Sequence, residues 1–422
     1  MTPRLLGIDV GTSGVRAALL TAEGDLAGMA AASFATIGED PSAPQTWWRA
    51  TRLCLAELRE GHDLSALRSL AVDGTSGTVL AVDGDGEPVG PALMYDQACE
   101  DDAFIARIAA EAPAGSPALG RTSGLARVLA AQDRPGVRHC LHQADWLAGK
   151  LSGRFDRSDE NNALKTGYDP ISRTWPDWIA RTGADLAKLP RIVEPGTPIG
   201  PVSDTARSLG LPAGALVHAG TTDGCASFLA TGADRIGDGV TALGSTLVIK
   251  LLSDAPVFEP AYGVYSHRLG ERWLVGGASN TGGKVIASLF PGADLAALTA
   301  RLRPEHPTGL YFYPLNRPGE RFPINDPALA PRLEPRPGDD ALFFQAVLEG
   351  IAAIEALAYR RLAELGAPTL NSVRSVGGGA GNEAWARMRL ARLGVPFEPA
   401  LSQEACVGTA RLLLSRPGVA SA

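Results

Sequence analysis

Short apolar runs that lead into small polar turns recur along this chain. The first is RLLGIDV, followed by the turn GTSG and a second apolar run, VRAALLTAEGDLAG. An uninterrupted apolar run of this length is typical of a strand buried on both faces, and Glu23-Gly24-Asp25 has the composition of a hairpin turn. We therefore predict two strands joined by the glycine turn at residues 11–14.

The same order of apolar run, polar turn and apolar run occurs twice more. Residues 69–90, SLAVDGTSGTVLAVDGDGEPVG, repeat it closely, and residues 237–257, GDGVTALGSTLVIKLLSDAPV, repeat it more loosely. Repeated units of this kind indicate internal duplication. We expect a strand, a turn and a second strand in each copy.

Longer segments between these units carry apolar residues at helical spacing. They predict helices at residues 44–61, 100–112 and 339–366, the last ending at Gly366. Strands alternating with long helices predict an α/β protein. The proline-rich residues 303–338 carry aromatic side chains, so we expect a long ordered segment there and not a free linker.

Residues 139–142, HCLH, are the nearest approach to a metal-binding pattern. On the helix that we expect here, His139 and His142 would share one face. No further acidic or sulfur ligand follows nearby, so an ordinary packed or surface helix is the preferred interpretation.

Length and composition fit a two-domain enzyme. The 422 residues exceed what one hydrophobic core usually serves, and a glycine-rich segment at residues 225–240 is the expected boundary. The net charge of −7 and the scattered basic residues disfavour a nucleic-acid partner. The five widely spaced Cys predict no disulfide framework, and no leader or long apolar run is visible, so we expect a cytoplasmic protein without membrane contact.

The turn after Asp9 combines a carboxylate, backbone amides and hydroxyl groups within six residues. These groups suit a metal-bound polyphosphate, and a carboxylate next to phosphate implies Mg²⁺ between them. A plain hairpin whose polar side chains satisfy turn amides is the alternative. The spelling fits neither a dinucleotide-binding turn nor, in GASNTGGKV, the Gly-x4-Gly-Lys-Ser/Thr phosphate loop.

Two later segments carry further candidate chemistry. In VHAGTTDGCASFLATG, Asp223 enters a small-residue helix, where it could cap the helix, accept a proton from a substrate hydroxyl, or do both. In SVGGGAGNEAWARM, consecutive glycines precede Asn382, so a flat ring could lie against bare backbone. An ordinary strand-to-helix loop is the alternative.

Five segments, in order along the chain, together resemble the FGGY carbohydrate kinases, relatives of actin, hexokinase and Hsp70. They are GIDVGTSGVRAALLTAEGDLAG, the segment QADWLAGKLSGRFDRSDENNALKTGYDPISRTW, GTTDGCASFLATGA, TALGSTLVI and SVGGGAGNEAWARMRLARLGVPFE. The resemblance implies two actin-like (ribonuclease H-like) domains, each with a five-stranded mixed sheet flanked by helices, and ATP in the cleft between them. It places a sugar-binding domain at 1–230, with 405–422 returning to it, and a nucleotide-binding domain at 231–404.

The resemblance also implies roles for individual residues. Asp9 would position Mg²⁺ and Asp223 would be the general base. Contacts to ATP are expected from the phosphate-binding residues Gly11, Thr12, Ser13, Gly244, Ser245 and Thr246 and from the adenosine-pocket residues Gly378, Gly379 and Asn382. Contacts to the sugar are expected from Asp9, Ser13, Asp73, Asp96 and Asp223.

The expected reaction is ATP-dependent phosphorylation of a terminal hydroxyl of a ketopentose. Ala98 stands where an Arg is expected, and GTSGVR, DGTSGT and MYDQ look most like the D-ribulose kinases of cyanobacteria and plants, so D-ribulose is the expected sugar. D-xylulose or another ketose or polyol is the alternative within the family, and an actin-like or Hsp70-like ATPase acting on a protein is the alternative of another class. A homodimer is possible.

Overall fold

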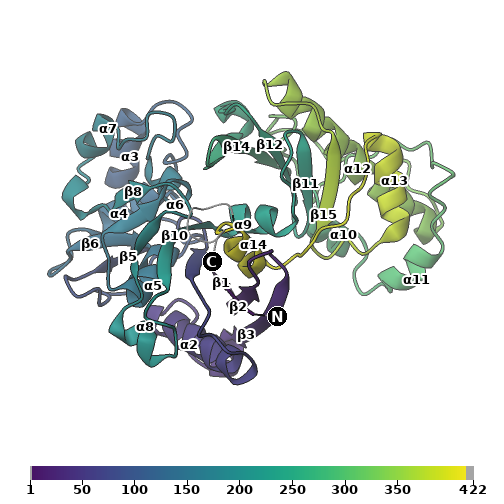
Figure 1. The fold of residues 1–422 in the computed structure, drawn as a ribbon. Helices are drawn as coiled ribbons and strands as arrows, with labels where there is room; N and C mark the ends of the chain where they lie inside the picture. Colours follow the sequence, from purple (N-terminus) through teal and green to yellow (C-terminus); the bar gives the residue numbers. More distant parts are fainter. Residues whose placement is uncertain (1, 415–422) are drawn as a thin grey trace. The chain divides into compact units, whose positions relative to one another are not determined.

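The computed structural model describes residues 2–414, and the chain divides into two compact units. Domain 1 comprises residues 1–230 together with 404–422, and domain 2 comprises residues 231–403 (Figure 1). Of the segment 405–422 that is expected to return to the first domain, residues 415–422 lie outside the described residues. The two domains are described separately below.

Domain 1 is built on a six-stranded mixed sheet with the strand order β3-β2-β1-β4-β10-β9. Strand β1 pairs antiparallel with β2 and parallel with β4, and β4 pairs parallel with β10. The short edge strand β9 adds a sixth strand to the five that we expected. The strands are β1 (Leu5–Val10), β2 (Gly14–Leu20), β3 (Leu26–Ser33), β4 (Ser69–Gly74), β9 (Pro198–Pro201) and β10 (Leu216–Thr222).

Helices cover both faces of this sheet, which is why β1 and β4 are buried along their whole length. The helices α2 (Pro44–Gly61) and α5 (Gln143–Ser152) pack on the face that carries Leu6, Ile8 and Val10. The opposite face, which carries Leu5 and Ala71, packs against α14 (Ala405–Arg411).

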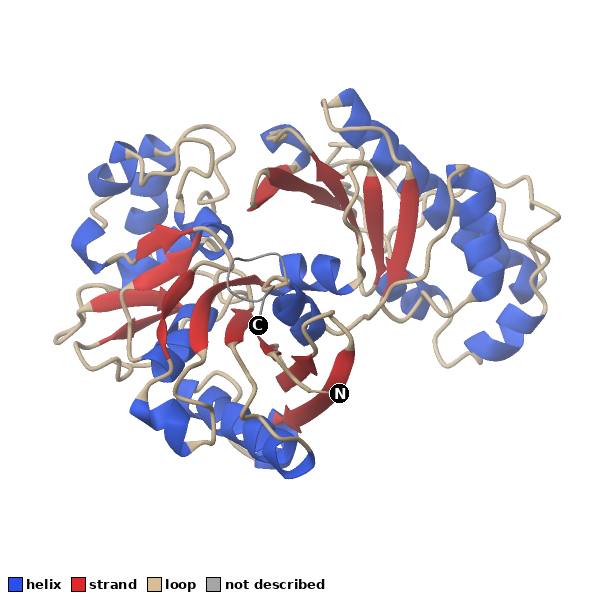
Figure 2. Cartoon of the chain, in the orientation of Figure 1, coloured by secondary structure: helices blue, strands red, loops and turns tan. Residues whose placement is uncertain are grey.

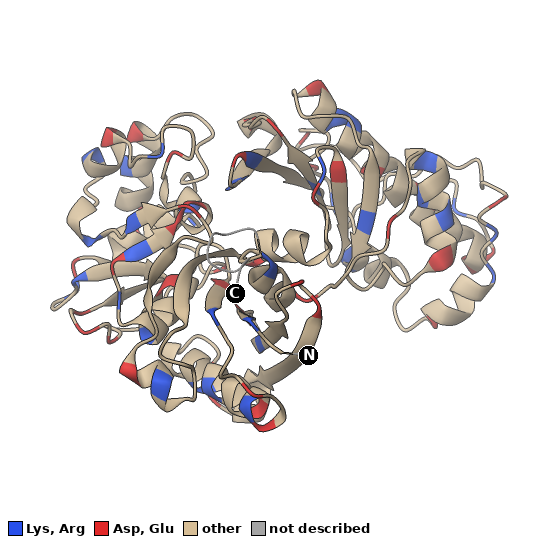
Figure 3. Cartoon of the chain, viewed as in Figure 1, with Lys and Arg blue, Asp and Glu red and all other residues tan. Residues whose placement is uncertain are grey.

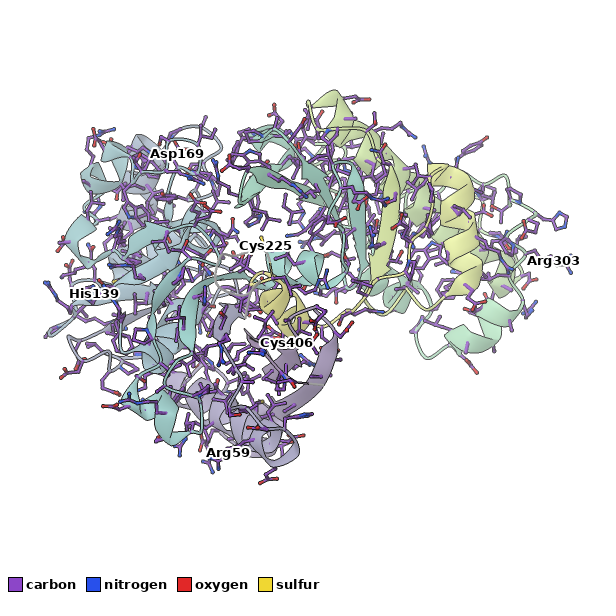
Figure 4. The ribbon with its side chains drawn as sticks, viewed as in Figure 1. Arg59, His139, Asp169, Cys225, Arg303 and Cys406 are labelled. Carbon is purple, nitrogen blue, oxygen red and sulfur yellow. The ribbon has the colours of Figure 1, made fainter. Side chains whose placement is uncertain are left out.

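The helix α14 also packs on α9 (Asp223–Ala230), and Figure 4 labels one cysteine on each of the two helices. A Cβ added at Gly408 of α14 would lie 1.8 Å from the backbone oxygen of Ala226 in α9. The absence of a side chain at Gly408 therefore allows the two helix backbones to touch.

The rest of domain 1 forms a second layer around its own apolar cluster, which includes Val79, Leu125 and Ile179. Its strands form two pairs, β5 (Val79–Val82) with β6 (His139–His142) and β7 (Arg157–Asp159) with β8 (Arg191–Val193). The remaining helices of domain 1 are α1 (Phe34–Ile37), α3 (Asp102–Glu111), α4 (Gly124–Ala131), α6 (Glu160–Ala163), α7 (Asp177–Arg181), α8 (Asp204–Ser208), η1 (Leu164–Thr166) and η2 (Leu186–Lys188). Of these, α1 and α8 pack with the core of the main sheet.

Residues 69–90 form the predicted strand, turn and second strand, but the two strands do not pair with each other, because the chain leaves the main sheet after β4 and β5 pairs with β6. One prediction for this layer is wrong. The HCLH segment is a strand and not a helix, so residues three apart point to opposite faces (His139 is labelled in Figure 4). The ring of His142 hydrogen-bonds to Asp145 and Thr166, so it holds neighbouring elements together.

Domain 2 repeats part of the domain 1 sheet. Its strand order β13-β14-β12-β11-β15 places the hairpin β11–β12 next to an antiparallel strand on one side and a parallel strand on the other. The strands β14, β12, β11 and β15 thus correspond to β3, β2, β1 and β4, as expected for an internal duplication. The domain 2 strands are β11 (Asp238–Leu243), β12 (Leu247–Ser253), β13 (Tyr265–Leu269), β14 (Arg272–Ala278) and β15 (Ser372–Val376).

Helices flank this sheet as well (Figure 2). They are η3 (Pro260–Tyr262), α10 (Gly283–Leu289), α11 (Leu295–Ala300), α12 (Asp340–Glu364) and α13 (Glu383–Leu393). The prediction of an ordered segment at residues 303–338 is confirmed, because Phe312, Leu315 and Phe322 are buried in the core of domain 2.

By length and apolar composition, α12 is the one helix among residues 2–414 that could cross a membrane. Most of its apolar window, 78%, is buried inside the protein, and Val347, Ile351 and Ile354 belong to the core of domain 2. Its apolar character is accounted for by that core.

We predict that Gly408→Ala destabilises domain 1 by about 1–3 kcal/mol, because the added methyl group would overlap the Ala226 carbonyl. Gly61→Ala is the matched control, since Gly61 also lies in a helix but has open space around its Cβ position. Thermal unfolding of both variants tests this. Equal melting temperatures for Gly408→Ala and Gly61→Ala would contradict the close packing of α14 on α9.

Candidate active site

The parallel strands of domain 1 bring three acidic residues to one edge of the sheet. Asp9 near the end of β1 pairs in register with Asp73 near the end of β4, and Asp73 is in register with Thr221 of β10. The chain turns into α9 directly after β10, so Asp223 occupies the first turn of that helix. The carboxyl ends of parallel strands are where α/β proteins usually place ligands.

Asp9 and Asp73 form a coupled pair of buried carboxyl groups. Asp9 is 6% exposed and Asp73 is 0% exposed. Burial raises the pKa of Asp9 to about 6, and hydrogen bonding to Asp73 partly opposes this rise. Burial, followed by the charge of Asp9, raises the pKa of Asp73 well above its ordinary value. Of the two, Asp73 therefore holds its proton more strongly, and Asp9 ionises first.

The surroundings of this pair hold it in place. Thr409 of α14 donates its hydroxyl hydrogen to Asp73. Arg16, opposite Asp9 on β2, lies 4.0 Å from the Asp9 carboxylate and 3.3 Å from that of Glu404. Asp73 is fully buried beside Asp9, and its contact with the sugar stays a prediction. Its position suits the support of Asp9.

Asp223 is half-buried and closer to solvent than Asp73. Its carboxylate accepts a hydrogen bond from the backbone amide of Gly224 at 2.7 Å, and its charge contributes to the raised pKa of Asp9. The side-chain amides of Asn161 and Asn162 fix the strand end before it, donating to Thr221 at 3.0 and 3.1 Å. The geometry is compatible with both roles considered for Asp223, helix capping and proton acceptance.

The predicted turn between β1 and β2 is present. The amide of Gly11 donates to the oxygen of Gly14 at 3.0 Å, and the oxygen of Ser13 accepts from the amide of Phe34 at 3.0 Å. Thr12 and Ser13 are exposed. Their hydroxyl groups lie a few residues from Asp9, as a polyphosphate site would require.

Asp96 lies on an exposed loop after β5. The amide of Tyr95 donates to the hydroxyl of Thr78 at 3.1 Å, and that hydroxyl lies 2.6 Å from the hydroxyl of Thr75. Thr75 in turn donates to the side-chain oxygen of Gln143. This chain of hydrogen bonds ties the loop to the end of β4, two residues beyond Asp73.

The corresponding strand ends of domain 2 have different chemistry. In the duplicated register, Ala242 of β11 and Val376 of β15 are paired in the way that Asp9 and Asp73 are in domain 1. The turn at Gly244, Ser245 and Thr246 is held by α10, whose Gly283 amide donates to the Gly244 oxygen at 2.8 Å. At its strand ends, domain 2 therefore has small neutral residues in a turn where domain 1 has acidic side chains.

This turn forms one wall of a pocket of about 740 Å³ that lies entirely in domain 2. A second wall is the glycine segment before α13, where a Cβ added at Gly379 would lie 2.6 Å from the Trp385 ring. The pocket is lined by Leu243, Gly244, Ser245, Leu247, Gly282, Gly283, Lys284, Ile286, Ala287, Leu295, Ala296, Thr299, Phe344, Leu348, Ile351, Gly378, Gly379, Gly381, Asn382 and Trp385. Apolar walls and bare backbone suit a flat heterocycle.

Asn382 has a structural task in this pocket. Its side-chain oxygen caps α13 by accepting from the Trp385 amide at 2.9 Å, and its side-chain nitrogen donates to Thr299 at 3.1 Å. Among the ATP contacts predicted in domain 2, Thr246 is the one that does not line the pocket, although it belongs to the turn that does. The predicted contacts Gly11, Thr12 and Ser13 belong to domain 1 and do not line it either.

Sequence reasoning missed several residues of both sites. In domain 2 it missed the wall from α10 to α12, including Lys284, although GASNTGGKV had drawn attention as a rejected phosphate loop. In domain 1 it assigned no role to Gln143, Asn161 or Asn162. The polar run SDENNALK after an apolar helix was a usable signal for the last two.

A divalent cation fits the acidic edge of domain 1 only if phosphate and water oxygens supply most of its ligands. Among residues 2–414, no group of three or more His, Cys, Asp or Glu side chains is arranged to hold a metal ion. Magnesium commonly takes only one or two protein carboxylates and fills its other positions with phosphate and water oxygens. The ionised, largely buried Asp9 suits such a single contact.

Comparison with known proteins shows what the chain is similar to. Residues 239–415 match the model of the FGGY family of carbohydrate kinases, C-terminal domain. The chain is 25% identical to the xylulose kinase of Escherichia coli K12 over 411 residues, which covers 91% of this chain and 83% of that protein. The expected kinase class is therefore confirmed.

Solved structures of sugar kinases share the two-domain actin-like fold of this chain. The xylulose kinase of Rhodospirillum rubrum has a TM-score of 0.81 at 24% identity, with 97% of this chain and 88% of that chain covered. The glycerol kinase of Plasmodium falciparum with ADP has a TM-score of 0.80 at 14% identity, with 98% and 89% covered. The predicted fold class is confirmed.

We predict that Asp9→Asn stabilises domain 1 at pH 8, by on the order of 1–3 kcal/mol. The folded pKa of about 6 lies above the ordinary 3.8, so ionised Asp9 opposes folding above pH 6 and this cost disappears as the pH falls toward 4. Thermal melting from pH 4 to 8 should show the variant's advantage growing with pH. An advantage that is constant with pH would contradict a raised Asp9 pKa.

Proposed function

We propose that this chain is an FGGY kinase that transfers the γ-phosphate of ATP to a terminal hydroxyl of a ketopentose. The observation that carries the proposal is the division of chemistry between the domains. Domain 1 gathers carboxylates at its strand ends, as a hydroxyl acceptor requires, and domain 2 has a pocket with apolar and glycine walls, as a nucleoside requires.

In this proposal the domain 2 pocket holds ATP. The adenine ring would lie against Gly378 and Gly379, with Asn382 supporting the wall by capping α13. The turn at 244–246 and the turn at 11–13 would donate backbone amides and hydroxyl groups to the phosphates. Such donors stabilise the charge that develops on the transferred group.

Asp9 would hold Mg²⁺, which when bound neutralises phosphate charge. Asp73 would hold Asp9 in place, because a protonated Asp73 donates a hydrogen bond to Asp9 and adds no second negative charge. Ser13 and Asp96, both exposed, would contact the sugar together with Asp223.

Asp223 would accept the proton of the attacking hydroxyl. The hydrogen bond from the Gly224 amide favours the ionised form of its carboxylate and fixes its orientation. The sugar oxygen then forms the new bond to the γ-phosphorus while the bond to the β-phosphate oxygen breaks, and ADP leaves. The proton passes from the sugar hydroxyl to Asp223.

For the sugar itself we propose D-ribulose, on the resemblance of GTSGVR, DGTSGT and MYDQ to D-ribulose kinases. D-Xylulose is the second candidate, and the relative from Escherichia coli, a xylulose kinase, favours it. Both are ketopentoses, so the reaction and the roles above are the same for either.

A cytoplasmic location and a homodimer remain predictions. In Figure 3, basic and acidic residues are interspersed over the elements of both domains.

We predict that Asp223→Asn lowers kcat by about 10²–10⁴-fold, because the amide cannot accept the hydroxyl proton. Asp204→Asn is the matched control, since Asp204 also lies in the first turn of a domain 1 helix but follows Pro201, which pairs with the first residue of β10, at the edge of the sheet opposite to Asp223. Nucleotide binding, measured by calorimetry, should be unchanged in both. Near-normal turnover by Asp223→Asn would remove the proposed base.

The sugar is tested by ADP release over a panel of ketoses and polyols with Mg²⁺ and ATP. We expect the highest kcat/KM with a ketopentose, D-ribulose above D-xylulose, and a phosphate on the terminal hydroxyl of the product by phosphorus NMR. Higher activity with D-xylulose would replace the first candidate by the second. No sugar-dependent ADP release would contradict the proposed function.

A further inference from the structure

A single buried guanidinium holds the loop that carries Asp96. Arg127 lies in α4 and is only 2% exposed. One of its terminal nitrogens, Nη2, donates to the backbone oxygens of Tyr95 and Gln97, both at 2.7 Å. These are the two residues on either side of Asp96. The hydrogen bonds from Arg127 therefore fix the backbone conformation of the loop at Asp96.

The other terminal nitrogen joins this loop to two further segments. Nη1 donates to the oxygens of Gly77 at 3.0 Å, Thr122 at 2.7 Å and Ser123 at 3.2 Å. Gly77 belongs to the turn after β4, which also carries Thr75 and Thr78. Arg127 thus connects the Asp96 loop to the turn that follows Asp73.

All five of these acceptors are neutral carbonyl groups, so Arg127 is a buried charge held without a paired carboxylate. Burial lowers its pKa, and the charge of Asp96 is the largest influence that opposes this. Burying a charge costs free energy, whereas neutral hydrogen-bond donors could hold the loop without that cost.

Apolar packing does not hold the loop in place. Residues 95–98 are exposed, and a cavity of about 480 Å³ lies beside them, lined in part by Gln97, Ala98 and Arg127. Residues 95–98 are instead held by hydrogen bonds, which are those from Arg127, the one between the Tyr95 amide and Thr78, and two between Met94 and Gln97. The flanking residues Met94 and Cys99 are partly buried against the apolar clusters of domain 1.

We propose that Arg127 is a positioning residue for sugar recognition, which orients Asp96 toward the hydroxyl groups of the ketopentose. This rests on the proposed function. Arg127 does not touch the sugar. It fixes the backbone on both sides of Asp96, whose carboxylate can accept hydrogen bonds from a polyhydroxylated substrate.

Arg127→Lys tests this role, because Lys keeps the charge but cannot reach five carbonyl groups with a planar fork. We expect KM for the preferred ketopentose to rise at least tenfold, while KM for ATP and kcat stay within about threefold. Arg134→Lys is the matched control, since Arg134 donates to the backbone oxygens of Val89 and Pro91 in the preceding segment. It should leave all three constants unchanged.

A double-mutant cycle separates positioning of Asp96 from a general structural effect. Asp96→Asn alone should also raise the ketopentose KM, and adding Arg127→Lys should raise it little further, because both changes remove the same interaction. Independent, multiplying effects would overturn the proposal, as would an unchanged ketopentose KM in Arg127→Lys. Loss of folding in Arg127→Lys would also overturn it, by showing that the guanidinium serves the core.

The wild-type protein distinguishes this inference from the proposed function. If it phosphorylates no ketopentose, the proposed function fails, and the role of Arg127 fails with it. If it is active and the Arg127→Lys constants match those of Arg134→Lys, only the role of Arg127 fails.

Discussion

The site of domain 1 depends on the burial of two carboxyl groups side by side at the ends of parallel strands. The parallel register of β1 and β4 places Asp9 next to Asp73, and helices on both faces exclude water from them. Ionising both carboxyl groups there would be costly, so Asp73 holds its proton more strongly and Asp9 ionises first. The stability of the fold is thereby reduced at the point where the chemistry is expected.

Domain 2 uses the same strand order without this cost. At the positions equivalent to Asp9 and Asp73 it has Ala242 and Val376, and its strand ends lead into a neutral turn and an apolar pocket. One duplicated framework therefore supplies two complementary surfaces, a charged edge suited to a hydroxyl acceptor and a pocket suited to a nucleoside. The two surfaces differ because of a few side chains at matching register positions.

The sequence predicted the elements whose signal is local. The turn after Asp9, the helix at 44–61 and the long helix beginning near 339 are visible in residue periodicity and glycine placement. What the sequence did not reveal has tertiary causes. HCLH forms a strand because β5 lies next to it, and β5 leaves the main sheet because its partner lies about sixty residues later in the chain. Arg127 and the α10–α12 wall of the pocket act through contacts between distant segments, and no spacing in the sequence reveals such contacts.

The most direct test of the account is the titration of the aspartate carboxyl carbons by NMR, with the Asp9 signal assigned by its loss in Asp9→Asn. The account predicts that Asp9 titrates near pH 6, while Asp73 stays protonated to higher pH. If both residues titrated near pH 4, as exposed carboxyl groups do, the buried pair on which the site depends would not exist.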